Sequence, residues 1–166
     1  MPWPQIFLYV MTAAMVAVIV YDLTRYIIPN TLNLFILGLY PFAAYVLGLD
    51  WMMALAAAGI VLLVGFGIFA LGFMGGGDIK LLVVLTLWVG WGAGALNFFF
   101  LTALLGAVLV IAVLLARFLI APIWARLSPE RGLPRILRSK QPVPYGIAIA
   151  AAFLVLAHTK QIAAFA

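Results

Sequence analysis

Six apolar runs take up most of this chain and constrain its fold more than any other feature. They cover about residues 6–21, 32–49, 52–73, 79–89, 95–120 and 145–157. A helix crosses the hydrocarbon of a bilayer with about 20 apolar residues, and in lipid every backbone polar group must find a partner within the fold. We therefore predict an all-α membrane protein, a bundle of about six transmembrane helices surrounded by the lipid bilayer.

Composition excludes the soluble and the disordered classes. Of the 166 residues, 69% are hydrophobic and only 8% are charged. Soluble domains are about half apolar and about a quarter charged, and one of this size could not bury so much apolar surface. The chain has no cysteine and one histidine, which excludes disulfides, cysteine-based metal centres and polyhistidine metal sites within one chain. No linker or repeat divides it, so residues 1–166 are predicted to form a single domain.

The basic residues set the predicted orientation. With six spans, the first, third and fifth spans end on the same side of the membrane, and eight of the nine basic residues follow those ends. These are Arg25, Lys80, Arg117, Arg126, Arg131, Arg135, Arg138 and Lys140, whereas Lys160 lies on the opposite side. Basic residues favour the cytoplasmic side, so both termini are predicted to face outward. The basic segment 121–144 is predicted to be a loop or short interfacial helix that either anchors the topology or binds anionic lipid headgroups.

Two of the four acidic residues stand out. Asp50 falls in a short outer turn, where aspartate is ordinary turn chemistry, and Glu130 falls in the basic segment, where an ion pair is expected. Asp22 and Asp78 lie at span ends, and the two crossings between them return the chain to the starting side. Two carboxylates at the same level can meet, share a proton and act as an aspartic-protease pair. The alternative is two interfacial aspartates, Asp78 as a helix cap and Asp22 paired with Arg25.

The residues that flank Asp22 and Asp78 show what kind of backbone surrounds each carboxylate. Asp78 follows Gly75-Gly76-Gly77 and precedes Ile79-Lys80, so the approach to it carries no side chains. Asp22 is followed, after a short segment containing Arg25, by Ile28-Pro29-Asn30. Pro29 ends helical structure before it, and Asn30 or Thr31 is expected to cap the second helix.

These motifs resemble those of the type IV prepilin peptidase family, which are membrane aspartic proteases. The stretch from Asp22 through Arg25 to Pro29-Asn30 resembles the first motif of the family, and Gly75-Gly76-Gly77-Asp78 with Lys80 matches its Gly-x-Gly-Asp motif. Pro144-Tyr145-Gly146 resembles the Pro-aromatic-Gly motif that opens the last helix of the family. The order of the motifs and the six-span layout agree, so the resemblance covers essentially the whole chain.

The resemblance implies a function and roles. Asp22 and Asp78 would be the catalytic pair, and Gly75 and Gly77 would shape the turn that presents Asp78. Arg25 would tune Asp22 or contact lipid, and Lys80 would neutralise charge or reach the interface. The substrate would be a prepilin or pseudopilin helix, cut on the cytoplasmic face of a bacterial inner membrane. Water would be the nucleophile, so no metal or organic cofactor is expected. No nucleic-acid partner is expected either. Contact with the pilus assembly machinery would be compatible with this function.

The sequence also departs from the longer members of the family. Those members carry a cysteine-containing methyltransferase domain. This chain has no cysteine, so we expect no such domain in it, and it resembles the short peptidases of tight-adherence (Flp) pilus systems. Archaeal preflagellin peptidases share the aspartate pair and stay open as relatives. A competing class is a proton- or ion-coupled transporter subunit, which would use the same carboxylates. No second half resembles the first, and both aspartates lie near one face rather than the midplane, which favours the peptidase.

Overall fold

The computed structural model describes residues 3–127, 132–138 and 141–165, and this part of the chain contains helices and no strand. Its α-helices are α1 (Trp3–Arg25), α2 (Asn30–Leu47), α3 (Trp51–Ala70), α4 (Gly76–Val89), α5 (Ala93–Leu127) and α6 (Gly146–His158), with the short 3-10 helices η2 (Arg135–Leu137) and η3 (Ala163–Phe165). The predicted all-α class is therefore confirmed. Four of these helices, α1, α2, α3 and α5, are long and apolar enough to cross a membrane. The count of six spans and their orientation stay predictions.

Several helix ends differ from the predicted ones. The helix α3 stops at Ala70 rather than near residue 73, because Gly72 adopts φ 75° and the N–H of Phe73 donates to the carbonyl of Ile68 at 3.1 Å. The helix α4 begins at Gly76, so two of the three glycines lie inside it rather than before it. The helix α5 continues to Leu127, so the first seven residues of segment 121–144, predicted as a loop or short interfacial helix, are part of α5.

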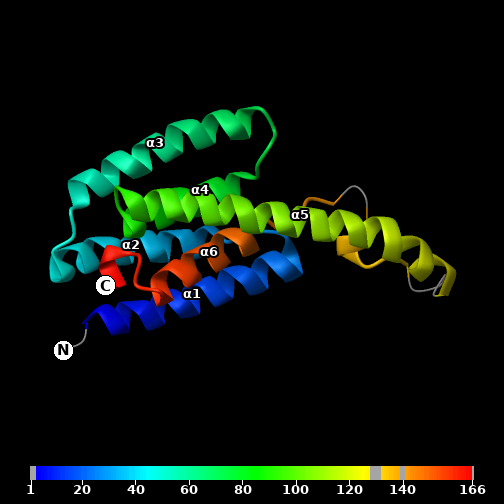
Figure 1. The fold of residues 1–166 in the computed structure, drawn as a ribbon, viewed down its shortest axis with the longest axis horizontal. Helices are drawn as coiled ribbons and strands as arrows, with labels where there is room; N and C mark the ends of the chain where they lie inside the picture. The colour runs from blue at the N-terminus through cyan, green and yellow to red at the C-terminus, as the bar shows by residue number, and fades with distance from the viewer. Residues whose placement is uncertain (1–2, 128–131, 139–140, 166) are drawn as a thin grey trace.

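The helices run alongside one another in a bundle with two irregular features (Figure 1). The helix α6 packs against α1 and α5, and α4 packs against α2, α3 and α6. The helix α3 packs mainly on α4 and stands off from the rest of the bundle, while α5 projects beyond the other helices at one end. The start of α1 and the short helix η3 lie at the opposite end, where η3 contacts α1 (Figure 1).

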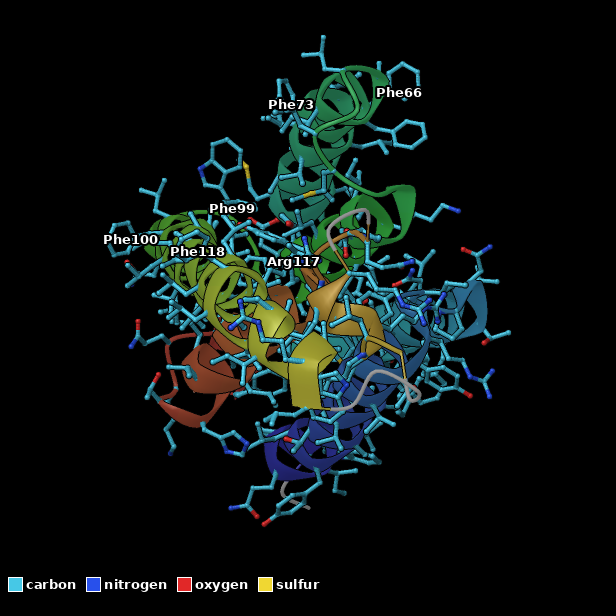
Figure 2. All side chains as sticks on the ribbon, turned by 90° about the vertical axis from the view of Figure 1, so that its right-hand side faces the viewer. Phe66, Phe73, Phe99, Phe100, Arg117 and Phe118 are labelled. Carbon is cyan, nitrogen blue, oxygen red and sulfur yellow. The ribbon has the colours of Figure 1, made fainter. Side chains whose placement is uncertain are left out.

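The interior and the outside of this bundle are both apolar. Trp88 lies at the centre of one end, stacked on Phe165 with ring centroids 6.1 Å apart. On the outside, Phe66 lies on α3 and Phe100 and Phe118 lie on α5, and all three point away from the bundle (Figure 2). Phe118 is 78% exposed. Exposing this ring to water would cost free energy, whereas exposing it to lipid would not. The surface is that of a membrane protein.

Candidate active site

A cavity of about 1000 Å³ lies at the end of the bundle where α1 ends and α4 and α6 begin. Its lining comes from segments that are far apart in the sequence. The residues are Asp22, Tyr26 to Asn30, Ile68, Gly72 to Asp78, Lys80, Val110 and Pro142 to Tyr145. The three sequence motifs thus meet around one space, and both predicted aspartates line it.

Asp22 lies in the last turn of α1, and its side chain is only 4% exposed. Its Oδ2 accepts a hydrogen bond from the backbone N–H of Ile147 at 3.2 Å. Ile147 belongs to the first turn of α6, where the free N–H groups and the helix dipole favour a negative charge. The C-terminus of α1 is an unfavourable place for a carboxylate, and the N-terminus of α6 offsets that cost.

Gly146 allows this contact because it has no side chain. A Cβ built there would lie 2.8 Å from Oδ2 of Asp22 and 2.8 Å from Cδ1 of Ile28. Real Cβ atoms essentially never come so close to other heavy atoms. Sequence reasoning noted Gly146 through the resemblance but assigned it no place in the site. Its position in a Pro-Tyr-Gly segment before an apolar run was the available signal.

Asp78 lies in the first turn of α4, whose N-cap is Gly75. The carboxylate bends back toward this cap, because a Cβ on Gly75 would lie 3.0 Å from Oδ2 of Asp78. Gly75 has φ −71°, which any residue adopts, so the close approach of the carboxylate is what favours glycine here. Gly77 packs on Ile28, where a Cβ would make an ordinary 3.5 Å contact.

The structure brings the two predicted carboxylates together. Both side chains line the same cavity, Asp22 from the last turn of α1 and Asp78 from the first turn of α4. Two carboxylates in such a site resist ionising together, so the pair can hold one proton and one negative charge. This arrangement can both accept a proton from water and donate one to a carbonyl oxygen.

The supporting residues of the motifs take different positions. Nζ of Lys80 donates to Oδ1 of Asn30 at 3.1 Å, and this bond joins the two halves of the site across 50 residues. The expectation that Asn30 or Thr31 caps α2 is wrong, because Pro29 occupies the N-cap position and no side-chain cap forms. The side chain of Asn30 is directed to Lys80 instead.

Arg25 does not line the cavity. Its guanidinium carbon lies 5.2 Å from the centroid of the Tyr21 ring, one turn back along α1. A cation over an aromatic face is a favourable contact. The geometry therefore places Arg25 against Tyr21, and it does not support the alternative in which Arg25 is the partner of Asp22.

The remaining acidic residues and the histidine lie elsewhere. Asp50 caps α3 by accepting from the N–H of Met53 at 3.1 Å, as the turn interpretation predicted. Nε2 of His158 lies 3.2 Å from Oγ1 of Thr12, and neither residue lines the cavity. Glu130, Arg131 and Lys140 lie outside the described residues. Among the described residues, no three His, Cys, Asp or Glu side chains form a group that could bind a metal ion.

Fold and cavity together define a helical membrane protein with a pair of carboxylates at one end of its bundle. The chain belongs to the type IV leader peptidase family, whose sequence profile matches residues 9–111. That match includes both aspartates, the proline and asparagine after Asp22 and the glycines before Asp78. The resemblance seen in the motifs is thereby confirmed, and the family makes the protein a peptidase. No curated protein and no solved structure matches the chain.

Proposed function

We propose that this protein is a membrane aspartic endopeptidase that removes the leader peptide of type IV or Flp prepilins, with Asp22 and Asp78 as its catalytic pair. One observation carries the proposal: two carboxylates that are 56 positions apart in the sequence line one cavity at the end of the bundle. Membership of the leader peptidase family supplies the reaction class.

The reaction follows from what two carboxyl groups with one shared proton can do. The ionised carboxylate takes a proton from water, and the water oxygen attacks the carbonyl carbon of the scissile peptide bond. The protonated carboxyl gives its proton to the carbonyl oxygen, which leaves a gem-diol. As the C–N bond breaks, the first carboxyl protonates the leaving nitrogen and the second regains a proton from a gem-diol hydroxyl. Each step is general acid–base catalysis, and the pair returns to its starting state.

The cavity also suits a substrate that arrives from the membrane. Its lining includes Ile68 of α3, Phe73 in the turn after α3 and Val110 of α5. Phe73 is 80% exposed, so apolar surface continues from the carboxylates toward the lipid-facing side. An apolar precursor helix that lies against this side would bring its end over Asp22 and Asp78. A glycine at the cut would let the pair approach the backbone.

The proposed setting is a bacterial inner membrane with the cavity at its cytoplasmic face. Arg25 ends α1 and Lys80 lies in the first turns of α4, both at the cavity end of the bundle. Arg117 and Arg126 belong to α5, which projects beyond the bundle at this end (Figure 1), and Arg135 begins η2. Basic residues favour the cytoplasmic side of a membrane. The short-form relation to Flp peptidases is part of the same proposal.

The test is a leader-cleavage assay. The chain is co-expressed with a prepilin, and the precursor and mature forms are separated on a gel. Three variants are compared at equal membrane levels: Asp22→Asn, Asp78→Asn and, as a control of the same chemistry, Asp50→Asn. We expect the first two to lower cleavage at least about a thousandfold, because each removes one arm of the acid–base pair. Asp50→Asn should cleave like wild type, because its side chain caps a helix elsewhere.

The other outcomes are equally informative. Cleavage by Asp22→Asn or Asp78→Asn at the wild-type rate would remove that residue from the mechanism. Well-expressed wild type that cleaves none of several prepilins would overturn the proposal. The transporter alternative would then be tested by proton flux into vesicles with the same two variants.

A further inference from the structure

Tyr145 fills a notch in α5 that Gly106 creates. The buried residues of α5 include Phe98, Thr102 and Gly106, spaced four apart on one face, and α5 packs against α6. The ring edge and hydroxyl of Tyr145 lie so close to Gly106 that a Cβ there would overlap both. The backbone of Gly106 shows no positive φ, so the space taken by the ring is what favours glycine at this position.

The same tyrosine is the N-cap residue of α6. Its carbonyl accepts from the N–H groups of Ala148 at 3.0 Å and Ile149 at 3.2 Å, which closes the first turn of the helix. The next two residues contact the catalytic carboxylate, Gly146 by close approach and Ile147 by its N–H. The ring of Tyr145 therefore fixes α6 against α5 at the turn that presents donors to Asp22.

We infer that Tyr145 and Gly106 form a positioning lock, in which the tyrosine ring seated on the glycine sets the place of the α6 N-terminus and thereby holds Asp22 in its working position. The lock rests on the proposed function, because it acts through a carboxylate assigned to the catalytic pair. Tyr145 is a positioning residue here, and its ring rather than its hydroxyl does the positioning.

Small displacements matter at this point of the site. The bond from Ile147 to Asp22 is already 3.2 Å long, at the upper end of the usual range for N–H···O bonds. A methyl group on Gly106 would push the ring away from α5 and move the start of α6 with it. Misplacing a catalytic group by about 1 Å costs on the order of a hundredfold in rate. Substrate binding along α3 and the apolar end of the cavity would be unaffected.

The experiment measures kcat and KM for prepilin cleavage by the full chain in membranes. Gly106→Ala should lower kcat about tenfold to a hundredfold with KM within about twofold, because orientation is lost and binding is kept. Tyr145→Ala should lower kcat by a similar factor, whereas Tyr145→Phe keeps the ring and should retain most of the wild-type kcat. Gly38→Ala is the matched control, because its Cβ would meet nothing within 4 Å.

A second-site variant separates the lock from general damage to the fold. In the double variant Gly106→Ala with Tyr145→Leu, the shorter side chain leaves room for the new methyl group. Its kcat should exceed that of Gly106→Ala alone, which is a coupling expected only for residues in contact. If Gly106→Ala does not accumulate in membranes, Tyr145→Phe against Tyr145→Ala decides the question.

Two results would overturn the lock. One is a wild-type kcat for Gly106→Ala; the other is a Tyr145→Phe variant as inactive as Tyr145→Ala, which would assign the role to the hydroxyl. Asp22→Asn in the same assay distinguishes a failure of the proposed catalytic pair from a failure of the lock. If it still cleaves, the proposed catalytic pair fails; if it is inactive while Gly106→Ala is fully active, only the lock fails.

Discussion

Gly146 lies so close to Asp22 that a side chain there would collide with the carboxylate. The variant Gly146→Ala would place a methyl group 2.8 Å from Oδ2 of Asp22 and 2.8 Å from Ile28. Ile28 is 6% exposed and has little room to move, so Asp22 should lose its bond to Ile147. We expect prepilin cleavage to fall about tenfold to a hundredfold, measured at equal membrane levels.

Gly59→Ala is the control for this prediction. A Cβ at Gly59 would meet nothing within 4 Å, and alanine favours a helix interior over glycine by about 1 kcal/mol. The control should therefore cleave at the wild-type rate. If Gly146→Ala cleaves as fast as Gly59→Ala, Asp22 works from a position other than the one against α6.

The sequence is informative about single residues where local chemistry decides their position. Asp22 and Asp78 could be singled out because few carboxylates occur in so apolar a chain and span direction puts both at one level. The donor to Asp22 could not be predicted, because Ile147 is 125 positions away and its approach depends on how α6 packs. The same holds for Asn30, whose local pattern indicates a helix cap while tertiary contact directs it to Lys80.

At the scale of helices, Asp50 starts α3. Its carboxylate accepts from the N–H of Met53, which would otherwise lack a partner at the helix end. Asp50→Ala should lower stability by about 1 kcal/mol, seen as a lower melting temperature in detergent, because the cap is lost. Asp50→Asn keeps a capping side chain and should melt near wild type. A large loss of cleavage in Asp50→Ala at temperatures where it is folded would contradict its assignment as a structural cap.

Residues 132–138 and 141–144, called the strap below, are hydrogen-bonded to Arg117 of α5. Nε of Arg117 donates to the carbonyl of Ile136 at 2.9 Å, and Nη2 donates to the carbonyl of Gln141 at 2.8 Å. Figure 2 shows Arg117 on the α5 side of this segment. Arg117→Met removes both donors, and hydrogen bonds from charged groups contribute about 1.5–3 kcal/mol each. We expect trypsin to cut the strap at least about tenfold faster, because local opening becomes easier.

Arg25→Met is the matched control for the strap, because it removes a basic residue whose guanidinium lies over the Tyr21 ring instead. Unchanged trypsin cleavage in Arg117→Met would mean that other contacts, such as the bond from Trp124 to the Gly132 carbonyl, are enough to hold the strap on α5.

The sequence predicted the helices well because apolar runs define them. It placed the end of α5 seven residues early, because Pro122 is usually a helix breaker and here lies within the helix.

At the scale of the whole molecule, the sequence predicted the class and the order of helices, since hydropathy alone determines which segments can enter lipid. It could not predict that α3 stands off on α4 or that α5 projects past the bundle (Figure 1). Those features depend on which helix faces pack together, and the uniformly apolar helices carry no periodic signal of a buried side. Orientation in the membrane stays a prediction from charge.

That orientation is testable because the chain has no cysteine of its own. Single variants Arg25→Cys and Lys160→Cys place one thiol at the cavity end of the bundle and one at the opposite end. In intact cells, a membrane-impermeant maleimide should label Lys160→Cys and leave Arg25→Cys unlabelled until the cells are opened, because the basic end is predicted to face the cytoplasm. Labelling of Arg25→Cys alone would reverse the orientation and would put the carboxylate pair on the outer face. The six-span layout puts five crossings between residues 25 and 160, so the two positions should lie on opposite sides. Labelling of both variants in intact cells would contradict that layout.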